Sequence, residues 1–80
     1  MPTPPETVAV QRRLGRAIKS VRSERSITQE ELSRRTGLHP TYISDIERGA
    51  RNPSFAVMTR LADGLGITLA ELGSAYDCAD

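Results

Sequence analysis

The sequence predicts an all-α domain of five short helices. Apolar residues recur three, four and seven positions apart in successive segments, which is the period of amphipathic helices. Favoured N-cap residues precede several of these segments, and glycines follow them. No segment alternates apolar and polar residues for long enough to indicate a strand. At 80 residues, the chain has room for one small domain.

We expect the first helix to run from Thr7 to about Glu24. Arginines interleave with its apolar stripe and fall on the other faces of the helix. The stripe consists of Val10, Leu14, Ala17, Ile18 and Val21. Residues 1–6 contain three prolines, which cannot continue a helix, and we interpret this segment as a flexible N-terminal arm.

The second helix is expected to end near Thr36 and the third to span residues 40–48, with a tight turn between them. Thr28 and Glu31 have the spacing of a capping box, in which the hydroxyl accepts a first-turn amide and the carboxylate accepts the N–H of the cap residue. Gly37 suits the left-handed conformation that commonly follows a helix. Two helices joined by a short glycine-containing turn have the outline of a helix-turn-helix.

The last two helices follow Ser54 and Thr68, which are favoured N-cap residues. The apolar stripe of the fourth helix consists of Phe55, Met58, Leu61, Ala62 and Leu65. Thr68 and Glu71 form a second capping box, which opens a short fifth helix. We therefore expect a domain over residues 7–73, followed by an acidic C-terminal tail over residues 74–80.

The composition excludes several classes of protein. One cysteine and one histidine cannot supply four zinc ligands, and a single cysteine cannot form a disulfide within the chain. No apolar run approaches the roughly 18 residues of a membrane span, and the N-terminus lacks a signal-peptide pattern. Because the sequence also lacks a Gly-rich phosphate loop and paired carboxylates in an apolar setting, we expect neither an enzyme nor a cofactor-binding protein.

The net charge of +1 conceals a polarity along the chain. Residues 1–60 contain all 11 Lys and Arg but only six of the 10 acidic residues, so their net charge is +5. Residues 61–80 contain the other four acidic residues and carry a net charge of −4. A basic body suggests a polyanionic partner, although an ordinary solvated surface explains a charge of this size equally well.

The strongest motif surrounds the expected turn. It reads ITQEEL over residues 27–32 and TYISDIERGARNPS over residues 41–54. Over about residues 10–73, the chain resembles the Cro and phage-repressor-like helix-turn-helix family, also called the XRE type, and within it the controller proteins of restriction–modification systems. The resemblance implies a five-helix lambda-repressor-like domain of a prokaryotic or phage-like system that binds double-stranded DNA, with residues 40–48 as the recognition helix. The composition favours a cytoplasmic protein, and the small core and single recognition helix favour a homodimer.

The predicted third helix has one polar face and one apolar face. A helix turns by about 100° per residue, which places Thr41, Ser44, Asp45 and Arg48 together and the isoleucines opposite them. This polar face is either an ordinary solvated surface or a surface that enters the major groove of DNA. The resemblance assigns recognition contacts to Pro40, Thr41, Ser44 and Asp45. Asp45 departs from the basic or amide residue that many family members carry, and its carboxylate can accept a hydrogen bond from cytosine N4.

Other residues are candidates for contacts to the DNA backbone. The resemblance implies that Gln29 bonds a phosphate and braces the recognition helix, and helix N-termini favour anions directly. His39 is a helix cap or a phosphate contact, and the Tyr42 hydroxyl lies at the edge of the polar face. Arg51 and Asn52 are phosphate candidates in the following loop. The predicted DNA-binding residues are Thr28, Gln29, His39, Pro40, Thr41, Tyr42, Ser44, Asp45, Arg48, Arg51 and Asn52.

Four residues are given structural roles. Glu47 falls toward the back of the third helix, where an unpaired carboxylate is costly. The resemblance pairs this glutamate with Arg22 of the first helix. Leu69 and Leu72 of the fifth helix are a candidate dimer surface, with core packing as the competing interpretation.

Two functions from different classes fit these observations. The first is a sequence-specific DNA-binding transcriptional regulator that binds an inverted-repeat operator as a dimer. The second is a protein-interaction module, such as an antitoxin or an adaptor, which uses the fifth helix or the acidic tail. The two differ in the salt dependence of DNA binding, since only the first function displaces counterions from phosphates.

Overall fold

The computed structural model describes residues 5–79 and contains five helices, with no strand in that range. The helices are α1 (Pro5–Glu24), α2 (Gln29–Thr36), α3 (Pro40–Glu47), α4 (Phe55–Leu65) and α5 (Leu69–Cys78). The predicted all-α class is therefore confirmed. Pro5 and Glu6, which the sequence analysis assigns to the arm, belong to α1, where proline is tolerated in the first turn. Residues 1–4 of that arm lie outside the described residues.

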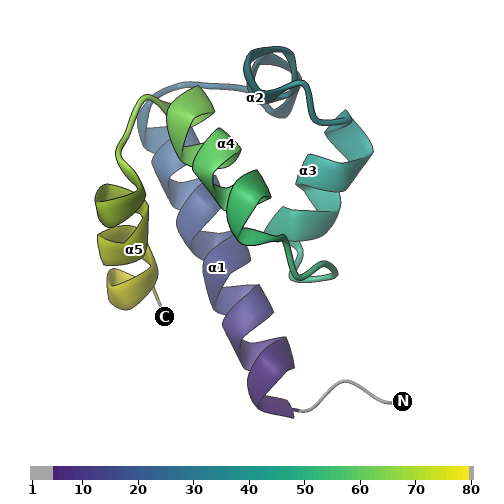
Figure 1. The fold of residues 1–80 in the computed structure, drawn as a ribbon, viewed down its shortest axis with the longest axis vertical. Helices are drawn as coiled ribbons and strands as arrows, with labels where there is room; N and C mark the ends of the chain where they lie inside the picture. Colours follow the sequence, from purple (N-terminus) through teal and green to yellow (C-terminus); the bar gives the residue numbers. More distant parts are fainter. Residues whose placement is uncertain (1–4, 80) are drawn as a thin grey trace.

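The long helix α1 runs through the centre of the bundle. It packs against α3 and against α5, while α4 packs against α2 and α5. In Figure 1, α3 and α5 lie on opposite sides of α1, and α2 crosses the top of the view. The helix-turn-helix formed by α2 and α3 therefore projects from one side of the molecule, away from α5.

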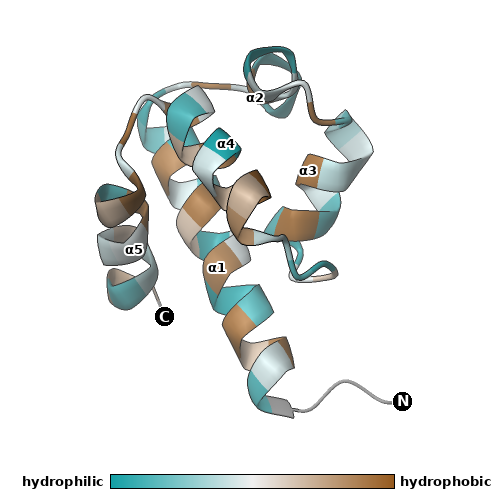
Figure 2. Cartoon of the chain, in the orientation of Figure 1, coloured by the Kyte–Doolittle hydropathy of each residue, from teal (hydrophilic) through white to brown (hydrophobic). Residues whose placement is uncertain are grey.

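The core is almost entirely aliphatic. Figure 2 shows hydrophobic bands on α1, α3 and α4, whereas α2 is mostly hydrophilic. The buried hydrophobic residues are Leu14, Ala17, Ile18, Val21, Ile27, Leu32, Leu38, Ile43, Ile46, Leu61, Ala62, Leu65 and Leu72. Three members of the predicted stripes lie outside this core. Met58 is partly buried and packs against it, whereas Val10 is 47% exposed and Phe55 is 68% exposed.

The two predicted capping boxes have different outcomes. At α5 the box is complete, since Thr68 Oγ1 accepts the Glu71 N–H at 3.0 Å and Glu71 Oε1 accepts the Thr68 N–H at 2.9 Å. The bond from the Thr68 N–H to the carboxylate holds the pKa of Glu71 below its usual range. At α2 only half of the box forms: Thr28 Oγ1 accepts the Glu31 N–H at 3.0 Å. The Glu31 carboxylate pairs with two arginines further along α2 instead of returning to the cap.

The expected acidic tail is largely helical. Helix α5 continues through Gly73 to Cys78 instead of ending at the glycine. Arg13 of α1 holds its last turn by donating to the carbonyl oxygens of Tyr76 at 2.8 Å and of Asp77 at 2.6 Å. The guanidinium of Arg13 also lies 4.9 Å from the centre of the Tyr76 ring. These contacts across the bundle extend a helix that local sequence signals would end.

Candidate nucleic-acid interface

The turn between α2 and α3 is held by side-chain bonds as well as by its glycine. Gly37 adopts the left-handed conformation, with φ at 75°. Ser33 Oγ donates to the Leu38 carbonyl at 2.5 Å, and the Leu38 N–H donates to Thr36 Oγ1 at 3.2 Å. Thr36 is buried, yet its hydroxyl is satisfied because it also donates to the Leu32 carbonyl. Neither hydroxyl role was predicted from the sequence, and together the two bonds tie α2 to the turn that precedes α3.

Helix α3 begins at a cap formed by His39. The His39 Nδ1 accepts the Thr41 N–H at 3.0 Å, and Pro40 occupies the first helical position. The predicted capping role of His39 is therefore confirmed. An Nδ1 that accepts a hydrogen bond assigns the proton of a neutral imidazole to Nε2. Since His39 is exposed, this leaves an N–H at the start of α3 that is free to donate outward.

The two faces of α3 are divided as the sequence predicts. Ile43 and Ile46 are almost completely buried and anchor the helix to the bundle. Thr41 is exposed at the front, and Ser44 and Asp45 are half-buried beside it. Because the back of α3 packs in the core, this helix can present only its small polar face to a ligand.

Charged side chains gather at the C-terminal end of this polar face. The carboxylate of Asp45 forms ion pairs with Arg48 and with Arg51, the second at 3.5 Å between Oδ2 and Nε. The guanidinium of Arg51 also lies 5.7 Å from the centre of the Tyr42 ring. The structure thus brings together four of the predicted DNA-binding residues, and both carboxylate oxygens of Asp45 face an arginine.

Behind α3, the predicted pair between Arg22 and Glu47 is present. Arg22 donates through Nε and Nη2 to the two carboxylate oxygens of Glu47 at 2.7 and 3.0 Å, and through Nη1 to the Ile27 carbonyl at 2.9 Å. The side chains are 14% and 4% exposed. The bonds to Glu47 raise the pKa of Arg22 further above its usual value, although partial burial opposes the shift.

Gln29 joins the same network. Its amide nitrogen donates to Glu47 Oε1 at 3.0 Å, so the first residue of α2 is tied to the last residue of α3. This bond provides the bracing of α3 that the resemblance implies. The amide has a second N–H, and because Gln29 is only half-buried, a phosphate contact through that N–H stays a prediction.

The two remaining predicted contacts lie beside this face. Thr28 is exposed at the N-terminus of α2, where its hydroxyl caps the helix by accepting the Glu31 N–H, and Asn52 is exposed in the loop after α3. Asn52 also borders an apolar groove, so it faces two different surfaces.

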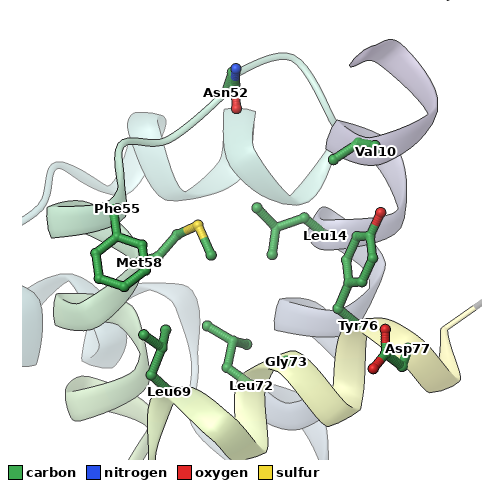
Figure 3. Close-up of a pocket in the computed structure, with 10 residues that line it drawn as sticks. All are labelled: Val10, Leu14, Asn52, Phe55, Met58, Leu69, Leu72, Gly73, Tyr76 and Asp77. Atoms are coloured by element: carbon green, nitrogen blue, oxygen red, sulfur yellow. The ribbon is translucent and has the colours of Figure 1, made fainter. Parts of the chain in front are cut away.

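The apolar groove lies between α1, α4 and α5 and has a volume of about 480 Å³. Figure 3 shows Leu14 and Met58 extending toward one another across it, with Leu69 and Leu72 rising from α5. The candidate dimer surface needs correction here: Leu72 is 1% exposed and belongs to the core, whereas Leu69 is half-buried. Helical spacing alone cannot separate these two leucines, because both lie on the inward side of α5.

Within residues 5–79, no helix combines the length and the hydropathy that a membrane crossing requires. The described side chains also include no cluster of three or more His, Cys, Asp or Glu residues suited to a metal ion.

A short helix with a buried apolar back and an exposed polar front, braced by a preceding helix across a tight turn, defines the helix-turn-helix class of DNA-binding proteins. A family model described as helix-turn-helix matches residues 18–72, and the chain belongs to this family, of the XRE type. The family consists of DNA-binding transcriptional regulators and not of enzymes.

Among its relatives, the chain is 38% identical to an uncharacterised helix-turn-helix transcriptional regulator, y4dJ, of Sinorhizobium fredii over 80% of this chain and 83% of the relative. It is 41% identical to the control protein C.MunI of a Mycoplasma species, over 78% of this chain and 85% of that protein. The crystal structure of the restriction–modification controller protein C.AhdI from Aeromonas hydrophila matches with a TM-score of 0.77 and 33% identity, over 80% of this chain and 97% of the other.

A second controller protein, C.Esp1396I, was crystallised as a tetramer in complex with its natural 35 base-pair operator. That structure matches with a TM-score of 0.81 and 29% identity, over 85% of this chain and 90% of the other. The predicted resemblance to restriction–modification controller proteins is therefore confirmed.

Proposed function

We propose that this protein is a sequence-specific, double-stranded DNA-binding transcriptional regulator, which binds an inverted-repeat operator as a homodimer with α3 in the major groove. The observation that carries the proposal is the construction of α3. Its back is anchored by buried isoleucines and by the Arg22–Glu47–Gln29 network, while its front carries small polar side chains flanked by exposed arginines. A rigid helix with such a front fits a groove and the phosphates beside it.

The dimer follows from the size of the recognition surface. Helix α3 has eight residues and can span only a few base pairs, which rarely gives useful specificity. A two-fold dimer places two such helices in successive major grooves, about 34 Å apart, and doubles the sequence that is read. We therefore expect selection from random duplex DNA to yield sites with two-fold symmetry, and selected sites without symmetry would contradict the dimer.

Thr41 and Arg51 are expected to contribute in different ways. Thr41 is exposed at the front of α3 and offers a hydroxyl and a methyl group to a base edge. Thr41→Ala should change the preference at one or two positions per half-site, by roughly 1–3 kcal/mol per base pair, and leave the salt dependence unaltered. Arg51→Ala should weaken binding to every duplex and lower the salt slope by about one, because one phosphate contact is lost.

Salt titrations of both variants, on the selected site and on random DNA, separate these roles. If Thr41→Ala loses affinity equally on the two duplexes, then α3 does not read a base at that position. If Arg51→Ala changes only the preferred sequence, Arg51 contacts a base and not the backbone. If the DNA affinity of the wild type depends on neither the DNA sequence nor the salt concentration, the result would favour a protein-interaction module instead.

For the dimer surface, we propose the apolar groove between α1, α4 and α5. Phe55, at 68% exposure, and Val10, at 47%, stand on the edge of this groove. A two-fold interface joins the same patch on both subunits, so a patch with both a protruding ring and a groove is suited to a second copy of itself. Burial of these side chains also supplies apolar contact area that the small core lacks.

Phe55→Glu should therefore convert the dimer to a monomer without unfolding it, because the side chain is mostly exposed in the single chain. We expect the dimer dissociation constant in sedimentation equilibrium to rise at least about tenfold, since a charge would be buried against apolar side chains. Ala56→Glu, at an exposed neighbouring position that does not line the groove, is the control. An unchanged dimer in Phe55→Glu would place the interface elsewhere.

A further inference from the structure

Asp45 is an unexpected residue on a DNA-binding face, because its carboxylate repels phosphate. The structure shows that this carboxylate is paired: Arg48 lies at one of its oxygens and Arg51 at the other. The Asp45 side chain is 17% exposed, whereas those of Arg48 and Arg51 are 64% and 58% exposed. Each carboxylate oxygen of Asp45 therefore lies beside a cation.

The backbone beneath these side chains is fixed by hydrogen bonds. The Arg48 N–H donates to the Ser44 carbonyl at 3.0 Å, and the Ala50 N–H donates to the Asp45 carbonyl at 2.8 Å. The ring of Tyr42 lies beside the guanidinium of Arg51 as a second support. The freedom that remains to the two arginines is therefore mainly that of their long side chains, and Asp45 restricts it.

We propose that Asp45 is a specificity-determining residue that acts by positioning Arg48 and Arg51, and not by reading a base itself. Exposed ion pairs add little to folding stability, so the consequence lies in binding. An arginine that leaves Asp45 to follow a phosphate leaves the carboxylate unpaired beside the polyanion, which is unfavourable. A duplex whose phosphates lie within reach of both arginines while these stay paired with Asp45 avoids this cost.

This arrangement discriminates against DNA in the wrong register or shape. Specificity is a difference between two affinities, and it increases when binding to the wrong partner is weakened. Proteins bind random duplexes mainly through flexible cationic side chains, which neutralise phosphates wherever these lie. By holding two cations in place, Asp45 weakens that mode more than it weakens binding to the operator. The inference rests on the proposed DNA-binding function.

The test is Asp45→Asn, with affinities measured on the selected site and on a random duplex over a range of salt concentrations. Affinity for the random duplex should rise about tenfold at low salt, and its salt slope should steepen by about one as the freed arginines reach phosphates. Affinity for the selected site should change less than about threefold, so the specificity ratio should fall. In an Arg48→Ala/Arg51→Ala background, Asp45→Asn removes only the repulsion of an unpaired carboxylate, so it should raise both affinities alike and leave the specificity ratio unchanged.

Glu31→Gln is the matched control. Glu31 also pairs with two arginines, Arg34 and Arg35, but on the exposed side of α2. The Glu31→Gln substitution removes the same charge as Asp45→Asn, and we expect the specificity ratio to stay at the wild-type value. A fall in the ratio equal to that of Asp45→Asn would mean that net charge alone explains the effect, which would overturn the inference.

Two other results for Asp45→Asn would also overturn it. Equal gains on both duplexes would show that Asp45 only adds repulsion. A loss confined to the selected site would show that Asp45 reads a base directly, as the cytosine contact predicts. A wild-type protein that prefers no duplex would overturn the proposed function and this inference together, whereas a normal wild-type preference that survives Asp45→Asn overturns the inference alone.

Discussion

Replacing Glu47 by alanine should destabilise the domain by roughly 3–5 kcal/mol, the cost of removing one partner from a buried ion pair. The loss leaves the Arg22 guanidinium, whose side chain is 14% exposed, without its bidentate acceptor. It also removes the acceptor of the Gln29 amide, which ties α2 to α3. Since a domain of this size has a net stability of roughly 5–10 kcal/mol, much of the folding free energy is at stake.

Urea unfolding of Arg22→Ala, Glu47→Ala and the double variant forms a double-mutant cycle. The double variant should be about as unstable as the less stable of the two single variants. The first substitution already leaves the other side chain without its ion-pair partner, so removing that side chain costs little more. Glu31→Ala, which breaks only exposed pairs on α2, should have little measurable effect. If the losses in unfolding free energy for Arg22→Ala and Glu47→Ala are strictly additive, the two side chains do not stabilise the fold as a pair.

Gly15→Ala should destabilise the domain by about 3 kcal/mol, although alanine is the better helix former. Gly15 lies in α1 where it crosses the C-terminal end of α3. A methyl group there would lie 2.5 Å from the carbonyl oxygens of both Ile46 and Glu47. Because these are backbone atoms, relief requires the two helices to move apart, and this places the effect at the upper end of the overpacking range.

Gly73→Ala is the matched control for Gly15→Ala. Gly73 is also inside a helix, but a methyl group there meets nothing within 4 Å. Its replacement should stabilise the domain by about 0.5–1 kcal/mol through helix propensity. Equal stabilisation by both substitutions would show that α1 and α3 tolerate a wider separation. If they do separate in Gly15→Ala, operator affinity should fall more than the loss of folded protein explains, since α3 is displaced.

The local signals for helix ends were accurate where a single residue decides the backbone. Thr28, Ser54 and Thr68 cap their helices, and the left-handed glycines follow α2 and α4. The division of α3 into an apolar back and a polar front also followed from its period alone. These features depend on residues within one helical turn of each other, so the linear sequence contains the information they need.

The misjudged features depend on contacts between distant segments. Helix α5 passes through Gly73 because Arg13, more than 60 positions away, binds the carbonyls of its last turn. Phe55 begins an apolar stripe and is still 68% exposed, because it stands on the edge of the groove and not in the core. The half-formed box at α2 is an exception with a local cause, because Arg34 and Arg35 of the next turn bind the Glu31 carboxylate.

The sequence by itself determined the helix order, the class of protein and the residues on the polar face of α3, since these follow from spacing, capping and a specific motif. Only the tertiary structure decided how those residues are used. It placed Leu72 in the core, tied Gln29 to Glu47 and gave Asp45 two arginine partners. The physical reason is that a side chain's role depends on which charged or apolar group lies within a few ångströms, and that is set by how the helices pack, which local periodicity does not encode.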